Sequence, residues 1–180
     1  MTVITGWLAA IGAFFLVLFI GSGFLGNGAG LIAACVAAYF AWKYFDDKYK
    51  AELNALLNPP SELWPVSMPT AWSCMKDVLM TAHMLTGVSG RSNWRIVSED
   101  NTKGVIQAQM DFQQALGSPS QSKIVNRLIV LSAQLYPEGD GTRVEIRYEI
   151  LSPMGTGMVE EMIRKTQASL KHRVMIGKGE

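Results

Sequence analysis

Residues 144–150 read Val-Glu-Ile-Arg-Tyr-Glu-Ile, and this short stretch does most to decide the fold. Its apolar residues alternate with charged ones, which is the period-two pattern of a strand with one buried face. The segment Pro137-Glu-Gly-Asp-Gly141 lies just before it, and such a cluster is typical of a turn. We therefore expect an antiparallel neighbour immediately upstream.

Three further strands are predicted upstream, from alternation or from β-rich composition: Trp94–Ser98, Ile106–Phe112 and Ile124–Leu135. A polar turn from Glu99 to Gly104 separates the first two, and a Gly/Ser/Pro loop from Gln114 to Lys123 separates the second two. Strands that follow one another through turns of this kind form an antiparallel meander, which leaves one face to be covered.

A helix is predicted on each side of the four strands. Thr70 is the expected N-cap of the first helix, whose apolar residues keep helical spacing as far as Leu85, and Gly87 marks its end. The second helix is expected from Met158 to Arg173, with this core stripe: Val159, Ile163, Thr166 and Leu170. The two apolar stripes are suited to cover the open face of the sheet.

The order α-β-β-β-β-α predicts a two-layer α+β sandwich with a four-stranded antiparallel meander. This order resembles helix-grip domains, in which a long C-terminal helix lies across a curved sheet. The resemblance concerns the fold alone, and a fold does not define a function.

The first 42 residues contain no Asp, Glu, Lys, Arg or His. Two apolar runs, Val3–Ile20 and Gly28–Phe45, would each span about 27 Å as helices, close to the hydrocarbon thickness of a bilayer. Gly21–Asn27 between them is glycine-rich and uncharged. The pattern predicts a transmembrane helical hairpin. A hairpin buried in a soluble core is the alternative, but neither helix has the polar face usual there.

The distribution of lysines predicts the orientation of this hairpin. Lys43, Lys48 and Lys50 follow the second run and the turn has no basic residue, so the positive-inside rule places both termini in the cytoplasm. With these lysines, Trp7, Trp42 and Tyr44 are expected to anchor the membrane interface. The chain is thus predicted to be a multi-pass integral protein of a bacterial plasma or inner membrane.

Four regions are expected along the chain: the hairpin (1–45), an amphipathic stalk (46–60), a cytoplasmic α+β domain (61–176) and a tail (177–180). In the stalk, Tyr49, Leu53 and Leu56 follow helical spacing. Asn58-Pro59-Pro60 is expected to end this helix, because proline excludes helical geometry from the preceding residue.

The sequence shows no motif for catalysis, a cofactor or a metal. The net charge of +1 argues against binding of nucleic acid through phosphates, and two cysteines do not form a zinc-ligand pattern. The glycines from Gly21 to Gly26 match a dinucleotide-binding spacing, but the alternation of strands and helices needed for that fold does not follow. His83 and His172 have no carboxylate or nucleophile at a useful helical offset. We expect a protein that is not an enzyme.

Methionines are the remaining candidates for function, and nine of the ten lie beyond residue 60. Six form the predicted apolar ligand or partner surface: Met75, Met80, Met84, Met154, Met158 and Met162. Methionine adapts to varied apolar partners, although it also fills irregular gaps in a core. The first hypothesis is a membrane-anchored scaffold or complex-assembly module with a protein partner or self-association. The alternative is a helix-grip-like module that binds a lipid or another apolar ligand. An enzyme assembled from dispersed residues is a third.

Overall fold

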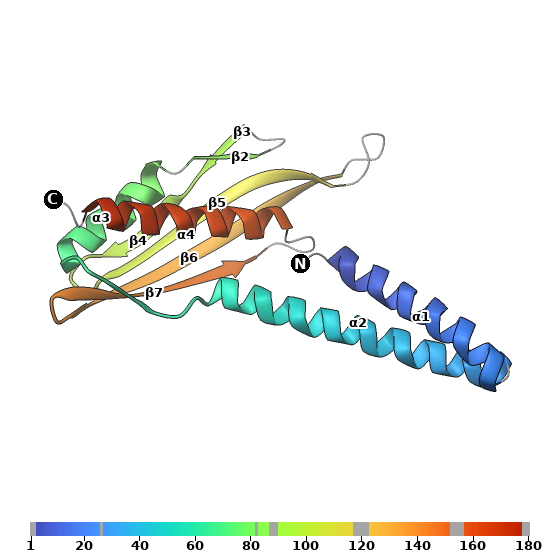
Figure 1. Ribbon diagram of the computed structural model, residues 1–180. Helices are drawn as coiled ribbons and strands as arrows, with labels where there is room; N and C mark the ends of the chain where they lie inside the picture. The colour runs from blue at the N-terminus through green and yellow to red at the C-terminus, as the bar shows by residue number, and fades with distance from the viewer. Residues whose placement is uncertain are drawn as a thin grey trace. The chain divides into compact units, whose positions relative to one another are not determined.

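The computed structural model describes residues 3–25, 27–81, 83–86, 90–116, 123–151 and 157–177 (Figure 1). The chain divides into two compact units, Met1–Asn54 and Ala55–Glu180. Each unit is described by itself below.

The first unit consists of helix α1 (Val3–Leu25) and most of helix α2 (Asn27–Leu57). Small residues lie where the two helices approach each other. A Cβ atom on Gly6 would lie 3.1 Å from Cβ of Phe45, and Ala10 and Ala34 are buried. Glycine and alanine therefore permit a close approach that larger side chains would prevent.

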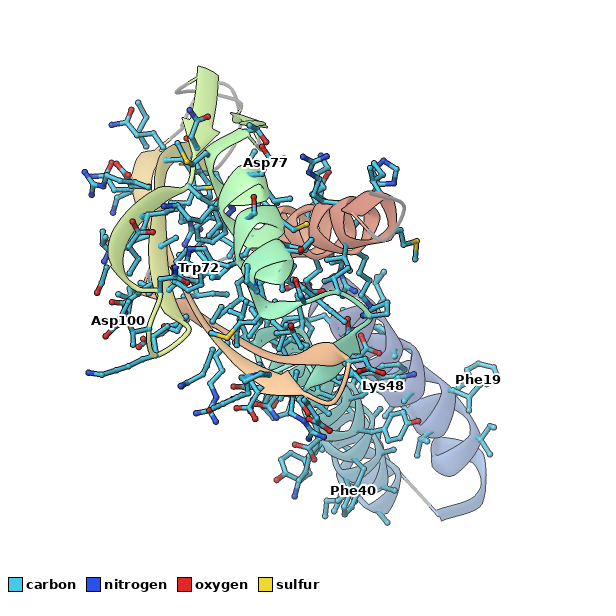
Figure 2. All side chains as sticks on the ribbon, turned by 90° about the vertical axis from the view of Figure 1, so that its left-hand side faces the viewer. Phe19, Phe40, Lys48, Trp72, Asp77 and Asp100 are labelled. Carbon is cyan, nitrogen blue, oxygen red and sulfur yellow. The ribbon has the colours of Figure 1, made fainter. Side chains whose placement is uncertain are left out.

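The outer surface of these helices is strongly apolar. Figure 2 shows the side chains of Phe19 and Phe40 pointing away from the helices. The large apolar side chains exposed on α1 and α2 are Trp7, Leu8, Ile11, Phe15, Leu16, Phe19, Ile20, Leu31, Ile32, Val36, Tyr39, Phe40, Trp42 and Tyr44.

The predicted transmembrane hairpin needs correction. Within the described residues, no helix combines the length and the apolar character that crossing a bilayer requires. In α2 the charged residues Lys43, Asp46 and Asp47 enter the same continuous helix. For the part of the chain that the structure describes, the two membrane spans, the integral-membrane location and the orientation derived from it are wrong.

The second unit contains a five-stranded antiparallel sheet in the order β1-β7-β6-β5-β4 (Figure 1). Its strands are β1 (Glu62–Trp64), β4 (Arg95–Asp100), β5 (Val105–Leu116), β6 (Lys123–Glu138) and β7 (Gly141–Ile150). Strands β4 to β7 lie where the four strands were predicted. The fifth strand, β1, was not predicted, because three residues that contain one aromatic side chain show no alternation.

Two helices pack on one face of this sheet, which we call the inner face. Helix α4 (Gly157–Gly177) runs along it, and α3 (Met68–Thr81) packs against α4 and β6 (Figure 1). The predicted stripe of α4, from Val159 to Leu170, is buried. The core between these layers is filled by residues that alternate along the strands, among them Ile106, Ala108, Met110, Ile129, Leu131, Ala133, Leu135 and Val144.

Helix α3 differs from the prediction at both ends. It begins at Met68, and the Ala71 amide donates to the Ser67 carbonyl at 2.8 Å, so Ser67 occupies the position expected for Thr70. It ends at Thr81, and the next residues form a two-stranded sheet of β2 (His83–Thr86) and β3 (Gly90–Asn93). The helical spacing that reaches Leu85 therefore continues by coincidence into a strand.

Candidate functional site

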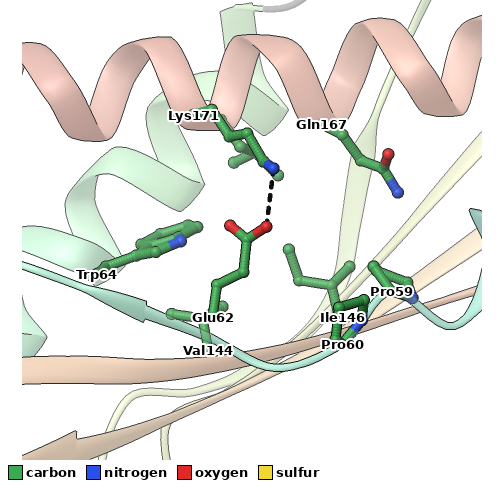
Figure 3. A pocket seen from close by; sticks show the side chains of 9 residues that line it. Pro59, Pro60, Glu62, Trp64, Val144, Ile146, Gln167 and Lys171 are labelled. Atoms are coloured by element: carbon green, nitrogen blue, oxygen red, sulfur yellow. Dashed lines mark ion pairs between the residues drawn. The ribbon is translucent and has the colours of Figure 1, made fainter.

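A pocket of about 240 Å³ lies between the C-terminal half of α4 and the strands β1 and β7 (Figure 3). Six of its lining side chains are apolar and three are polar. They are Pro59, Pro60, Trp64, Val144, Ile146 and Leu170, with Glu62, Gln167 and Lys171. A concave site with mostly apolar walls and a few polar groups is the usual form of a small-molecule site.

The wall contributed by β1 is held against β7 by the backbone and by one buried hydroxyl. Glu62 pairs with Val144 and Trp64 with Thr142 in the antiparallel register. Thr142 is fully buried, and its Oγ1 donates to the Val66 carbonyl at 2.9 Å. These contacts fix the short segment that carries Glu62 and Trp64 into the pocket.

The polar groups of the pocket come from two elements that are distant in the sequence. Lys171 Nζ on α4 lies 2.8 Å from Glu62 Oε1 on β1, and both side chains are partly exposed (Figure 3). One turn earlier on α4, Gln167 Nε2 donates to the Leu56 carbonyl at 3.2 Å. The pocket therefore presents one carboxylate, one ammonium group and one amide.

A second polar group lies deeper, between α4 and the sheet. Trp94 Nε1 donates to Thr166 Oγ1 at 3.1 Å, and Thr166 Oγ1 donates to the Met162 carbonyl at 3.0 Å. The Trp94 and Tyr148 rings lie 6.4 Å apart, and the Tyr148 hydroxyl is buried with no hydrogen-bond partner among the described residues. Burial raises the pKa of Tyr148 well above its usual range, because the phenolate cannot be hydrated there. None of these residues lines the pocket.

A cation is also buried on the inner face of the sheet. Arg127 on β6 is 1% exposed, and its Nε donates to Gln114 Oε1 on β5 at 3.0 Å. It lies on the same side of β6 as Ile129 and Leu131, so its charge is placed among core residues. The apolar spacing of β6 gave no sign of this burial, because arginine is normally exposed.

Four of the six methionines of the predicted surface have described side chains, and these four lie in different environments. Met75 and Met162 belong to the buried core, Met158 packs against that core, and Met80 is exposed on α3. The side chain of Met84 and the whole of Met154 lie outside the described residues. None of the described methionines lines the pocket.

The six predicted interface residues lie on the helices of the first unit. Trp7, Trp42 and Tyr44 are exposed, as are Lys43, Lys48 and Lys50. Lys50 Nζ pairs with Asp46 Oδ2 at 2.5 Å, one helical turn away. Throughout the described part of the chain, no three His, Cys, Asp or Glu side chains gather as a metal site would require.

The pocket was missed at the sequence level for identifiable reasons. Pro59 and Pro60 were interpreted only as the end of a helix. Gln167 and Lys171 border the predicted core stripe of α4 and look like ordinary solvated residues. Glu62 and Lys171 are 109 positions apart, so no local spacing indicates their pairing. The available signal was Trp64, a large aromatic residue in the short proline-containing segment that follows Pro59 and Pro60.

No protein-family model matches the chain, and the search of curated proteins found no significant match. Among solved structures, Ara h 8.0201 is 11% identical, with coverage of 67% of this chain and 96% of that one, and a TM-score of 0.48. A DUF4468 family protein from Bacteroides ovatus is 11% identical over 67% of this chain and 84% of that one, with a TM-score of 0.35. TTHA0849 from Thermus thermophilus is 14% identical over 65% and 95%, with a TM-score of 0.27. Values this low support no conclusion about ligand, partner or activity.

Proposed function

We propose that the second unit is a binding module for a small ligand with an apolar body, and that the ligand occupies the pocket beneath α4. The observation that carries this proposal is the pocket itself, whose volume of about 240 Å³ is bounded by six apolar side chains. Apolar surface that leaves water on binding supplies the driving force.

The size of the pocket limits the ligand. Pockets for drug-sized molecules are commonly about 300–1,000 Å³, so this one suits a smaller molecule. A six-carbon chain would bury roughly 150 Å² of apolar surface, which contributes about 4 kcal/mol. That corresponds to a dissociation constant on the order of 1 mM for a simple test ligand.

The test is the binding of hexanol to the full chain, followed by NMR on the indole N–H of Trp64. The variant Ile146→Trp fills the pocket from β7 and should abolish binding. The matched control is Ile124→Trp, which places the same large ring at an exposed position of β6 and should leave binding unchanged. The proposal fails if hexanol at roughly ten times the expected dissociation constant leaves the Trp64 signal unmoved. It also fails if Ile146→Trp and Ile124→Trp bind equally well.

The absence of enzymatic activity and the existence of a protein partner stay predictions. A partner would need an apolar surface to contact, and the exposed side chains of α1 and α2 supply one.

A further inference from the structure

The charged pair of the pocket carries an inference about the class of ligand, and this inference rests on the proposed binding function. Glu62 and Lys171 meet at 2.8 Å, with 41% and 57% of their side chains exposed. Ion pairs this exposed contribute little to stability, because water competes for both charges. A charged ligand can therefore replace one partner of the pair at small cost.

The two partners are not equally easy to displace. Glu62 belongs to β1, whose backbone is paired with β7, and its short side chain has little freedom to leave the site. Lys171 borders the buried stripe of α4, and its long, flexible side chain is more exposed than that of Glu62. When the Lys171 side chain leaves Glu62, it also regains conformational entropy, because more rotamers become accessible to it. The Glu62 carboxylate is therefore the partner that remains in the pocket and can bind a ligand.

Two other groups that line the pocket, the Trp64 ring and the Gln167 amide, also favour a positive charge. Glu62 and Trp64 are two residues apart on a strand, so their side chains lie on the same face, and both line the pocket. The face of an indole ring attracts cations. The Leu56 carbonyl oxygen can only accept a hydrogen bond, so the Gln167 side-chain atom that contacts it is the amide nitrogen Nε2. The other amide atom of Gln167, Oε1, is a hydrogen-bond acceptor.

We propose that the pocket selects a small organic cation, a protonated amine or a quaternary ammonium group with a short aliphatic body. The cation replaces the Lys171 ammonium at the Glu62 carboxylate and contacts the Trp64 ring. The aliphatic body lies against Pro59, Val144 and Ile146. No covalent step is involved.

The experiment compares hexylammonium, hexanol and hexanoate, which share one aliphatic chain, as ligands of the full chain in the same NMR titration. Hexylammonium should bind about fivefold more tightly than hexanol, and hexanoate should bind more weakly than hexanol. Glu62→Gln should reduce the ratio of hexylammonium to hexanol affinity to about one. Lys171→Met removes the competing ammonium group and should raise that ratio severalfold.

The control is Glu161→Gln. Glu161 pairs with Lys165 at 2.8 Å on the same helix, outside the pocket, so this variant removes an equivalent ion pair and should leave the ratio unchanged. Equal binding of the three ligands, tighter binding of hexanoate, or a ratio that survives Glu62→Gln would overturn the cation proposal and leave the apolar pocket intact. If none of the three ligands binds, the binding function itself is wrong.

Discussion

The indole N–H of Trp94 donates to the hydroxyl of Thr166 at 3.1 Å, and this bond joins the residue that immediately precedes β4 to helix α4, which covers the sheet. Both residues are buried, and the same hydroxyl donates to the Met162 carbonyl one turn earlier on α4. The bond therefore satisfies a donor in the core and places α4 along its axis over the sheet. The position of α4 in turn determines where Gln167, Leu170 and Lys171 lie in the lining of the pocket.

Thr166→Val should destabilise the second unit by about 1–3 kcal/mol, because the near-isosteric side chain leaves the Trp94 N–H buried without an acceptor. Urea unfolding followed by far-UV circular dichroism measures the change. The matched control is Thr81→Val, because Thr81 makes the same bond to a carbonyl four residues earlier, that of Asp77 at 2.6 Å, but at an exposed position. The control should stay within about 0.5 kcal/mol of the parent protein. Equal effects of the two substitutions would contradict the role assigned to Trp94.

Gly104→Ala should be strongly destabilising. Gly104 ends the turn between β4 and β5 with a φ of 66°, and a Cβ there would lie 2.3 Å from the Leu135 carbonyl oxygen. Gly139, in the turn between β6 and β7, has a φ of 58° but nothing within 4 Å of its Cβ position. Gly139→Ala should therefore lower the free energy of unfolding by only about 1 kcal/mol, which is the cost of a positive φ for alanine. Gly104→Ala should lower it clearly more, because the steric clash adds to that cost. Thermal unfolding of the two variants tests the order, and a reversal would refute the close approach at Leu135.

The periodic elements of the second unit could be predicted from the sequence, because their residues repeat a buried and an exposed side. The alternation of Val144, Ile146 and Tyr148 indicated β7, and the spacing of Val159 and Ile163 indicated the buried side of α4. Local patterns of this kind reflect the burial of one face, which is also the main source of stability.

Features that depend on pairing between distant segments could not be predicted. Strand β1 exists because three residues pair with β7, and β2 was hidden because Leu85 happens to continue the helical spacing of α3. The hairpin prediction failed for a different reason. It relied on the length of the apolar runs, and within the described residues no helix is long and apolar enough to cross a bilayer. The pocket joins residues 59–64, 144–146 and 167–171, which only the fold brings together.

Tyr148→Phe should change the dependence of stability on pH. Burial raises the pKa of Tyr148 in the folded state, so above pH ~10 the unfolded chain loses this proton while the folded protein keeps it. The parent protein therefore loses stability as the pH rises through that range, by up to about 1.4 kcal/mol per pH unit from this residue. The variant lacks this loss, and below pH ~10 it should be equal or up to about 1 kcal/mol more stable, because the hydroxyl has no partner among the described residues.

Urea unfolding of parent and variant, between about pH 8 and about pH 11, measures the difference in the free energy of unfolding. The gap between them should widen as the pH rises. Tyr136→Phe, which removes a hydroxyl at an exposed position of β6, controls for the substitution itself. A gap that stays constant with pH would show that the Tyr148 hydroxyl is hydrated in the folded protein.

Thr142→Val should weaken both the fold and the pocket. The Thr142 hydroxyl is fully buried and donates to the Val66 carbonyl at 2.9 Å, so valine leaves that carbonyl without its donor and should cost about 1–3 kcal/mol. Because this bond holds the segment that carries Glu62 and Trp64, the affinity for hexanol should fall severalfold in the same variant. Thr142→Ser keeps the hydroxyl and should retain the affinity, although it loses some stability with the missing methyl group. If the valine variant lost stability but bound hexanol as the parent does, the bond would support the sheet edge without shaping the pocket.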